Sequence, residues 1–342
     1  ELLTGKTKLK NQKIIREKLK NNKIDILIGT HSLFQDKIEF SKLGLIVIDE
    51  QHKFGVKQRI NLSLKGTNNT DVVLMTATPI PRTLVLTNYG DMNISTIKKK
   101  PFSNNNLTTL VKPIQKLDEV IAFVNQRMDN DDQIYWVCPL IDESEKLKLM
   151  AAIKRFELLK KKINHNIGLI HGSTKKEDKE KVMQDFIDGK IRGIISTTVI
   201  EVGIDNPNAN TIVIENAERF GLAQLHQLRG RVGRSGNEAN CILLYSSAIS
   251  ETGKKRLKIM KDSNDGFYIS EEDLKLRGYG DIIGYQQSGE KNFMIADPIY
   301  HSHLFELAKN NLDLLEQNNK SKYEILLKIF KKDRILNIID TG

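Results

Sequence analysis

The sequence predicts an α/β protein with two doubly wound parallel-sheet domains, followed by a mainly helical C-terminal part. Short, continuously apolar runs alternate with helical segments, a pattern typical of parallel strands that are covered on both faces. The first three of these runs end directly in polar residues, as expected where parallel strands reach a ligand-binding edge. The chain has 342 residues, and this length suffices for two domains of about 150 residues each.

The first domain is predicted to span residues 1–103 and to begin with a basic helix over residues 8–21. Its strands are expected over residues 24–28, 43–48 and 72–75. The stretch 98–106 is basic and then polar, without apolar periodicity, so we expect a linker there. The chain opens on a short apolar strand remnant without an initiator methionine, which leads us to expect a chain cut from a longer one.

The second domain is predicted over residues 104–250, with the same alternation of strands and helices. Its strands are expected over residues 133–138, 167–171, 191–196, 211–214 and 241–245, and its helices over 117–128, 146–162 and 175–188. Residues 251–342 form the third predicted part, which is mainly helical and is interrupted by a glycine-rich run over 277–289.

Charge and cysteine usage narrow the class of protein. The formal net charge is +10, which favours polyanionic partners, although a lysine-rich surface is common in other proteins too. The two cysteines, Cys138 and Cys241, form no CxxC pair, so neither a disulfide framework nor a zinc site is indicated, and a cytoplasmic location is expected. The longest nearly apolar stretch, over residues 134–141, contains a proline and is far shorter than the ~20 residues that span a bilayer.

An acidic pair, Asp49 and Glu50, follows the second apolar run. Beside a nucleotide, such a pair can hold Mg²⁺ through one carboxylate and position or deprotonate the attacking water through the other. The alternative is a solvated strand end with two capping carboxylates. The apolar strand before the pair and the Thr-Ala-Thr-Pro strand end after the next run favour the catalytic interpretation.

An arginine-rich run over residues 227–234 places glycines between arginines. The glycines let the backbone approach another surface, while planar guanidinium groups can bind phosphate oxygens with two hydrogen bonds. An arginine delivered in this way can stabilise the charge that develops on a transferred phosphoryl group. The alternative is a basic turn that faces solvent or an acidic surface.

Together these motifs resemble those of superfamily 2 helicases, and longer segments resemble the RecG family of ATP-dependent DNA helicases. The resemblance lies in residues 49–56, 75–84 and 218–229, and the run 273–289 is similar to a translocation element that this family shares with transcription-repair coupling factors. Residues 51–52 and His226 favour the RecG family. The resemblance implies two RecA-like domains, a helical translocation tail, and ATP-driven remodelling of stalled forks and Holliday junctions in replication restart, recombination and repair.

The resemblance also implies roles for individual residues. Asp49 and Glu50 become the Mg²⁺ and water-activating pair, and Arg231 and Arg234 the phosphate-sensing arginines. Nucleotide contacts fall to His52, Gly203, Asp205 and Gln227. The residues implied in DNA coupling are Thr30, His31, Thr76, Thr78, Gly172, Thr197, Arg277 and Gln287. For a single threonine or glycine among them, a turn or an N-cap is the alternative.

A helicase motor also needs a phosphate-binding loop of the form GxxxxGK[ST]. Residues 5–7, Gly-Lys-Thr, imitate its end, but the first glycine would precede residue 1. The distance from Thr7 to Asp49 leaves room for only one crossover of ~30 residues, whereas the family has more than one there. We therefore expect the first RecA-like domain to be incomplete, the family's fork-splitting wedge domain to be absent, and the chain alone to lack ATPase activity.

The partners implied by the resemblance are ATP, Mg²⁺ and branched or forked duplex DNA, with a single-stranded DNA-binding protein as a further partner. A monomer without membrane contact is expected. Two alternatives stay open at this point. In the first, the chain is a fragment of a coupling-factor translocase. In the second, it is a non-catalytic DNA-binding remnant, whose affinity for DNA falls steeply with salt and does not change with ATP.

Overall fold

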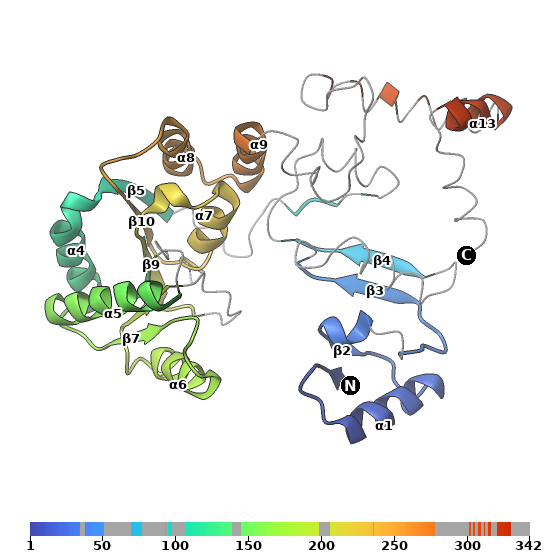
Figure 1. Ribbon diagram of the computed structural model, residues 1–342, viewed down its shortest axis with the longest axis horizontal. Coiled ribbons are helices and arrows are strands. Elements are labelled where there is room, and N and C mark those ends of the chain that lie inside the picture. The colour runs from blue at the N-terminus through green and yellow to red at the C-terminus, as the bar shows by residue number, and fades with distance from the viewer. Residues whose placement is uncertain are drawn as a thin grey trace. The chain divides into compact units, whose positions relative to one another are not determined.

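The computed structural model describes residues 1–34, 38–50, 70–76, 93, 95–97, 107–138, 145–197, 206–234, 236–277 and 320–329, with isolated positions between 301 and 315. The chain divides into two compact units, which are described separately (Figure 1). Unit 1 consists of Glu1–Ala77 and Leu307–Gly342, and unit 2 of Thr78–Glu306. The predicted domain boundary at residue 103 lies outside the described residues.

Unit 1 contains two short parallel sheets and a basic helix. Its elements are β1 (Leu2–Leu3), α1 (Leu9–Lys20), β2 (Ile28–Gly29), the 3₁₀ turn η1 (His31–Phe34), β3 (Leu45–Ile48), β4 (Asp71–Leu74) and α13 (Lys320–Ile329). β1 pairs with β2 and β3 with β4. Ile15 and Leu19 of α1 pack with Leu3 and Ile38 in a small core, as the apolar spacing of this helix requires.

Two expectations for unit 1 need correction. The strand expected over residues 24–28 begins only at Ile28, where the ladder with Leu2 and Leu3 of β1 starts. Before it, the amino group of Glu1 donates to the carbonyl of Ile26 at 3.0 Å without continuing the ladder. β3 was expected to be covered on both faces. Instead Ile46 and Ile48 are buried while Leu45 and Val47 are 55% and 54% exposed, so this strand alternates between a buried and an exposed face.

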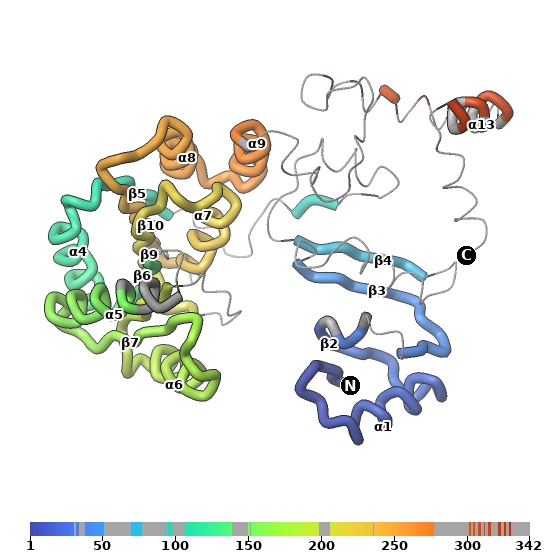
Figure 2. Tube along the Cα trace, viewed as in Figure 1, coloured from blue at the N-terminus to red at the C-terminus, as the bar shows by residue number. Residues whose placement is uncertain are grey.

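Unit 2 is built on one parallel sheet of six strands, in the order β5-β10-β9-β6-β8-β7. Its elements are β5 (Leu107–Pro113), η3 (Ile114–Lys116), α4 (Leu117–Asp129), β6 (Gln133–Val137), α5 (Glu145–Lys162), β7 (Ile167–Ile170), α6 (Lys176–Ile187), β8 (Gly193–Ser196), β9 (Ala209–Ile214), η4 (Ala217–Arg219), α7 (Leu222–Arg229), β10 (Ala239–Tyr245), α8 (Glu251–Asp262) and α9 (Gly266–Arg277). β6 lies beside β9 (Figure 2), and β8 is its neighbour on the other side.

Helices cover both faces of this sheet, which confirms the doubly wound prediction for unit 2. Tyr135 and Val137 of β6 pack with side chains of α6, α7, α8 and α9, whereas Trp136, between them, packs with side chains of α4 and α5. Because alternate side chains of a strand point to opposite faces, a strand covered on both sides reads as a continuous apolar run.

One strand and one α-helix of unit 2 were not predicted from the sequence. Among the described strands, β5 pairs only with β10 and is mostly half-buried, so threonine and lysine residues interrupt its apolar pattern. α7 was not predicted as a helix, yet Leu222, Leu225 and Leu228 form its buried side. In the described part of the chain, no helix is both long and apolar enough to cross a membrane.

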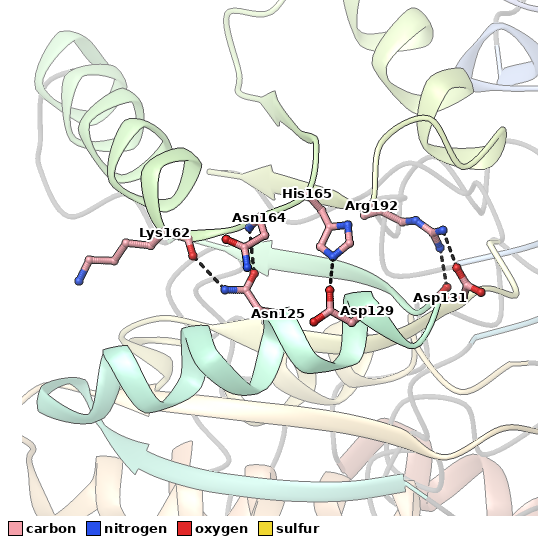
Figure 3. Close-up of polar contacts among 7 residues, drawn as sticks. All are labelled: Asn125, Asp129, Asp131, Lys162, Asn164, His165 and Arg192. Carbon is pink, nitrogen blue, oxygen red and sulfur yellow. Dashed lines mark hydrogen bonds and ion pairs between the residues drawn. The ribbon is translucent and has the colours of Figure 1, made fainter.

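Polar contacts join the turns at the amino edge of the unit 2 sheet (Figure 3). The side-chain amide of Asn125 donates to the carbonyl of Lys162 at 2.9 Å and accepts from the backbone N–H of Asn164 at 3.1 Å. Two more contacts continue this row: Nε2 of His165 is hydrogen-bonded to the Asp129 carboxylate at 2.7 Å, and Arg192 forms an ion pair with Asp131. These contacts tie the ends of α4 and α5 to the strands that start there, at the edge opposite the strand ends discussed next.

Candidate functional site

Asp49 and Glu50 directly follow β3 in unit 1, at the carboxyl edge of the β3–β4 sheet. The backbone N–H of Glu50 donates to the Asp49 carboxylate at 2.8 Å. Glu50 has a φ of 49°, a left-handed conformation that few residues other than glycine adopt and that is enriched at functional sites. The backbone N–H of Met75 donates to the carbonyl of Ile48 at 2.8 Å, so Thr76 follows at the same edge. The structure therefore brings the acidic pair and Thr76 together.

Thr30 and His31 follow β2, where η1 begins. The loop is anchored to β1, since the Ser32 hydroxyl donates to the carbonyl of Leu3 at 3.2 Å. A side chain on Gly29 would place its Cβ 2.2 Å from that same carbonyl oxygen, so only glycine fits there. Thr30 itself is exposed, as a contact to an external partner requires.

The arginine turn, residues 230–234, follows α7 in unit 2. Gly230 caps the helix, and Gly233 has a φ of 75°, which glycine adopts without strain. Arg231 is half-buried and Arg234 is exposed, with its Nε donating to the carbonyl of Gly230 at 3.1 Å. Gln227 lies half-buried in the last turn of α7. The turn therefore presents two guanidinium groups close to one helix end.

Arg229 was not among the predicted site residues, yet it is buried, with 1% of its surface exposed. Its Nη1 donates to the carbonyls of Met260 at 2.9 Å and Ser263 at 2.8 Å and to the Thr109 hydroxyl at 3.4 Å, and its Nη2 lies 3.2 Å from Nδ1 of His226. Burial lowers the pKa of Arg229. Its position seven residues after Leu222, on the buried side of α7, is the signal by which the sequence could have revealed it.

Other predicted residues lie at the carboxyl edge of the unit 2 sheet. Thr197 follows β8 and is buried, and its backbone N–H donates to the carbonyl of Ile170 at 3.3 Å. Gly172 is exposed in the turn after β7, which is held by a hydrogen bond of 3.0 Å from the backbone N–H of His171 to the Thr174 hydroxyl. Gly172 and Thr197 therefore share one edge of the sheet.

A buried carboxylate, Glu215, lies at the same edge and was missed by the sequence analysis. It accepts from Nε1 of Trp136 at 2.6 Å and from the Cys138 thiol at 3.8 Å, and it pairs with Arg155 at 3.1 Å. Burial raises the pKa of Glu215 and also raises that of the Cys138 thiol. Like Asp49, Glu215 directly follows an apolar strand, which is the signal that could have identified it.

The burial of Glu215 predicts a pH dependence. Its pKa is raised above the ordinary 4.5 in the folded state, so folded protein takes up this proton more readily than unfolded protein, and the resulting stability is lost as the pH rises through the raised value. Urea unfolding of the native chain and of Glu215→Gln, from pH 4.5 to neutral pH, should show the native chain losing stability relative to the variant. If the difference in free energy of unfolding between the two proteins stays constant as the pH rises, or changes in the opposite direction, the buried position of this carboxyl group is contradicted.

Several predicted site residues lie outside the described part of the chain: His52, Thr78, Gly203, Asp205 and Gln287. Arg277 ends α9, and its side chain is not described. Within the described residues, no group of three or more His, Cys, Asp or Glu side chains is arranged to hold a metal ion. The acidic pair belongs to unit 1 and the arginine turn to unit 2.

Comparison with known protein families first identifies the class of protein that this chain resembles. The family model "DEAD/DEAH box helicase" matches residues 2–86, and "Helicase conserved C-terminal domain" matches residues 113–236. These matches indicate RecA-like domains of the kind found in helicases, which is the class of protein that the fold and the polar strand ends point to. A third model, "ATP-dependent DNA helicase RecG, domain 3, C-terminal", matches residues 263–339. The chain belongs to the RecG family and corresponds to the C-terminal portion of its members.

Relatives of known name agree with this assignment. The chain is 45% identical over 312 residues to the ATP-dependent DNA helicase RecG of Bacillus subtilis, covering 91% of this chain and 46% of that protein. The RecG of Thermotoga maritima is 44% identical over 317 residues, covering 92% of this chain and 40% of that protein. A solved structure of RecG bound to a three-way DNA junction is 42% identical, with a TM-score of 0.66, and covers 89% of this chain and 39% of that one. The chain thus spans less than half the length of these relatives.

Proposed function

We propose that this chain is the C-terminal motor portion of a RecG-like ATP-dependent DNA helicase that remodels branched DNA in replication restart, recombination and repair. Two groups of side chains carry the proposal: Asp49 with Glu50 at a strand end, and Arg231 with Arg234 at a helix end. They occur in a family of which one solved structure shows RecG bound to a three-way DNA junction. The RecA-like domains would drive the cycle, and the helical region from α8 onward would act as the translocation tail.

The acidic pair supplies the chemistry proposed for the first RecA-like domain. Carboxylate oxygens are the ligands that Mg²⁺ prefers, and the exposed Asp49 offers them at a strand end. Mg²⁺, when bound with ATP, would neutralise charge on the phosphates. Glu50 is held beside it by its backbone hydrogen bond to Asp49 and would orient the attacking water.

The arginine turn supplies the complementary groups in the second RecA-like domain. Arg231 and Arg234 would contact the phosphates and stabilise the charge that develops on the γ-phosphoryl group. Gln227, one turn earlier, would hold the nucleotide, together with His52, Gly203 and Asp205. All four of these nucleotide contacts rest on the motif resemblance and are proposals for this chain.

The proposed DNA contacts lie at strand ends in both units. Thr30 and Gly172 are exposed at such ends and can approach a phosphate backbone without reading its sequence. The remaining proposed contacts are His31, Thr76, Thr78, Thr197, Arg277 and Gln287. The net charge of +10 supports binding to a polyanion. A cytoplasmic location, a monomeric state and a single-stranded DNA-binding protein as a partner stay predictions.

Strand separation tests this proposal. The full-length gene product should separate a forked duplex, but not a linear duplex of the same sequence, and only when ATP and Mg²⁺ are both present. The 342-residue chain by itself should bind the fork with an affinity that falls steeply with salt. It should not turn over ATP, because no GxxxxGK[ST] loop lies within its sequence.

Two outcomes would contradict the proposal. Fork binding by the full-length gene product without ATP-dependent strand separation, at an affinity that ignores nucleotide, would favour the non-catalytic DNA-binding alternative. Steady ATP turnover by the chain alone, abolished by Glu50→Gln, would show that it completes a nucleotide site without that loop.

A further inference from the structure

We propose that Arg229 is a positioning residue that fixes the arginine turn against the C-terminal end of α8. The inference rests on the proposed function, because the turn matters only if Arg231 and Arg234 act on a nucleotide. It concerns a side chain that cannot itself reach that nucleotide, since Arg229 is only 1% exposed.

The burial of Arg229 needs a physical explanation, because an unpaired buried charge is very costly. Among the described residues, no carboxylate forms an ion pair with Arg229. Its guanidinium instead donates to the carbonyls of Met260, in the last turn of α8, and of Ser263, the C-cap residue. The last carbonyls of a helix lack partners within the helix and carry about half a negative charge together. The end of α8 therefore balances this cation.

The same residue also fixes the start of the arginine turn, through its backbone and its side chain. Arg229 is the last residue of α7, and the backbone N–H of Val232 donates to its carbonyl at 3.4 Å. Its guanidinium also contacts the Thr109 hydroxyl on β5. The backbone of the turn is thus tied to α8 and to the sheet through one residue. A turn fixed in this way keeps Arg231 in one place without help from a bound ligand.

Hydrogen exchange of the full chain tests the inference without any need for ATPase activity. Arg229→Met keeps the length of the side chain but removes every donor. Amides of residues 230–234 and 260–266 should then exchange on the order of tenfold faster, relative to the rest of unit 2. Arg229→Lys keeps a cation and should restore part of the protection in both segments. Val124→Ala is the control, since Val124 is fully buried on α4, against the opposite face of the sheet.

Each outcome decides the question. Faster exchange in both segments, absent from the Val124→Ala control, supports the positioning role. Faster exchange near α8 alone, or equal changes in the control, overturns it. If Arg229→Met does not fold, the test rests on Arg229→Lys. Amide protection of residues 230–234 and 260–266 that is unchanged in Arg229→Lys would also overturn the inference.

Kinetics of the full-length gene product separate this inference from the proposed function. Misplacing a catalytic group by about 1 Å can cost about 100-fold in rate, so Arg229→Met should lower kcat for ATP by about that factor and change KM much less, with Arg229→Lys in between. If the native gene product hydrolyses no ATP, the proposed function fails, while the exchange experiment still judges the positioning role. A change in KM alone would contradict the role assigned to Arg229.

Discussion

Glu50→Gln should lower DNA-stimulated ATP hydrolysis by the full-length gene product by about 1000-fold or more, because phosphoryl transfer depends almost entirely on positioning and electrostatics. The amide keeps the size of the side chain and the backbone hydrogen bond to Asp49, so the fold is retained. Arg234→Ala removes a guanidinium group for which we propose a phosphate-sensing role, and it should have an effect of about 1000-fold or more as well. Steady-state ATP hydrolysis, with and without forked DNA, measures both.

Glu157→Gln is the matched control for this experiment. Glu157 is an exposed glutamate of α5, away from the strand ends that carry the proposed site, so the same chemical change there should leave hydrolysis within about twofold of the native rate. Near-native hydrolysis by Glu50→Gln would refute the role assigned to this carboxylate, provided that fork binding is unchanged.

Trp136→Ala should lower the free energy of unfolding of unit 2 by about 3–5 kcal/mol. Trp136 is fully buried at the centre of the core between the sheet, α4 and α5, and its removal leaves a large cavity. It also removes the hydrogen bond to the buried carboxylate of Glu215. Urea unfolding followed by circular dichroism measures the loss. Fluorescence cannot follow it, because Trp136 is the only tryptophan of the chain.

Trp136→Phe separates the two causes. Phenylalanine keeps an aromatic ring in the core but removes the indole donor, which leaves that oxygen of Glu215 with the weaker thiol donor of Cys138 at 3.8 Å, so we expect a smaller loss of about 1–3 kcal/mol. If Trp136→Ala costs less than Trp136→Phe, the packing assigned to this face of the sheet is wrong.

The strands that are buried on both faces were the easiest part of the fold to predict. The prediction over residues 133–138 is confirmed by β6, Gln133–Val137, and the prediction over 211–214 by β9, which starts two residues earlier. Both strands are fully buried, and the apolar runs over residues 134–137 and 212–214 made them recognisable. β5 carries polar residues because it lies at an edge of the sheet, so its pattern resembles that of a loop.

The candidate site was predictable where it depends on local sequence. Asp49 and Glu50 directly follow an apolar strand, and the arginine turn has its own glycine spacing. Arg229 and Glu215 each have a local signal, a position on the buried side of α7 or directly after an apolar strand, but their partners come from distant parts of the chain: the carbonyl of Met260 for Arg229, and the side chain of Trp136 for Glu215. Such pairings depend on how helices and strands pack, and no spacing in the sequence reports them.

The strand order of unit 2 determines when its sheet can be completed during synthesis on the ribosome. Among the described strands of this unit β5 comes first, yet its neighbour in the sheet is β10, which comes last. A ribosome therefore releases β5 long before its neighbour exists, and the sheet gains this edge only once residue 245 has emerged. Contacts between such distant segments form slowly. A product truncated ahead of Ala239 would leave β5 without its partner and open to association with other chains.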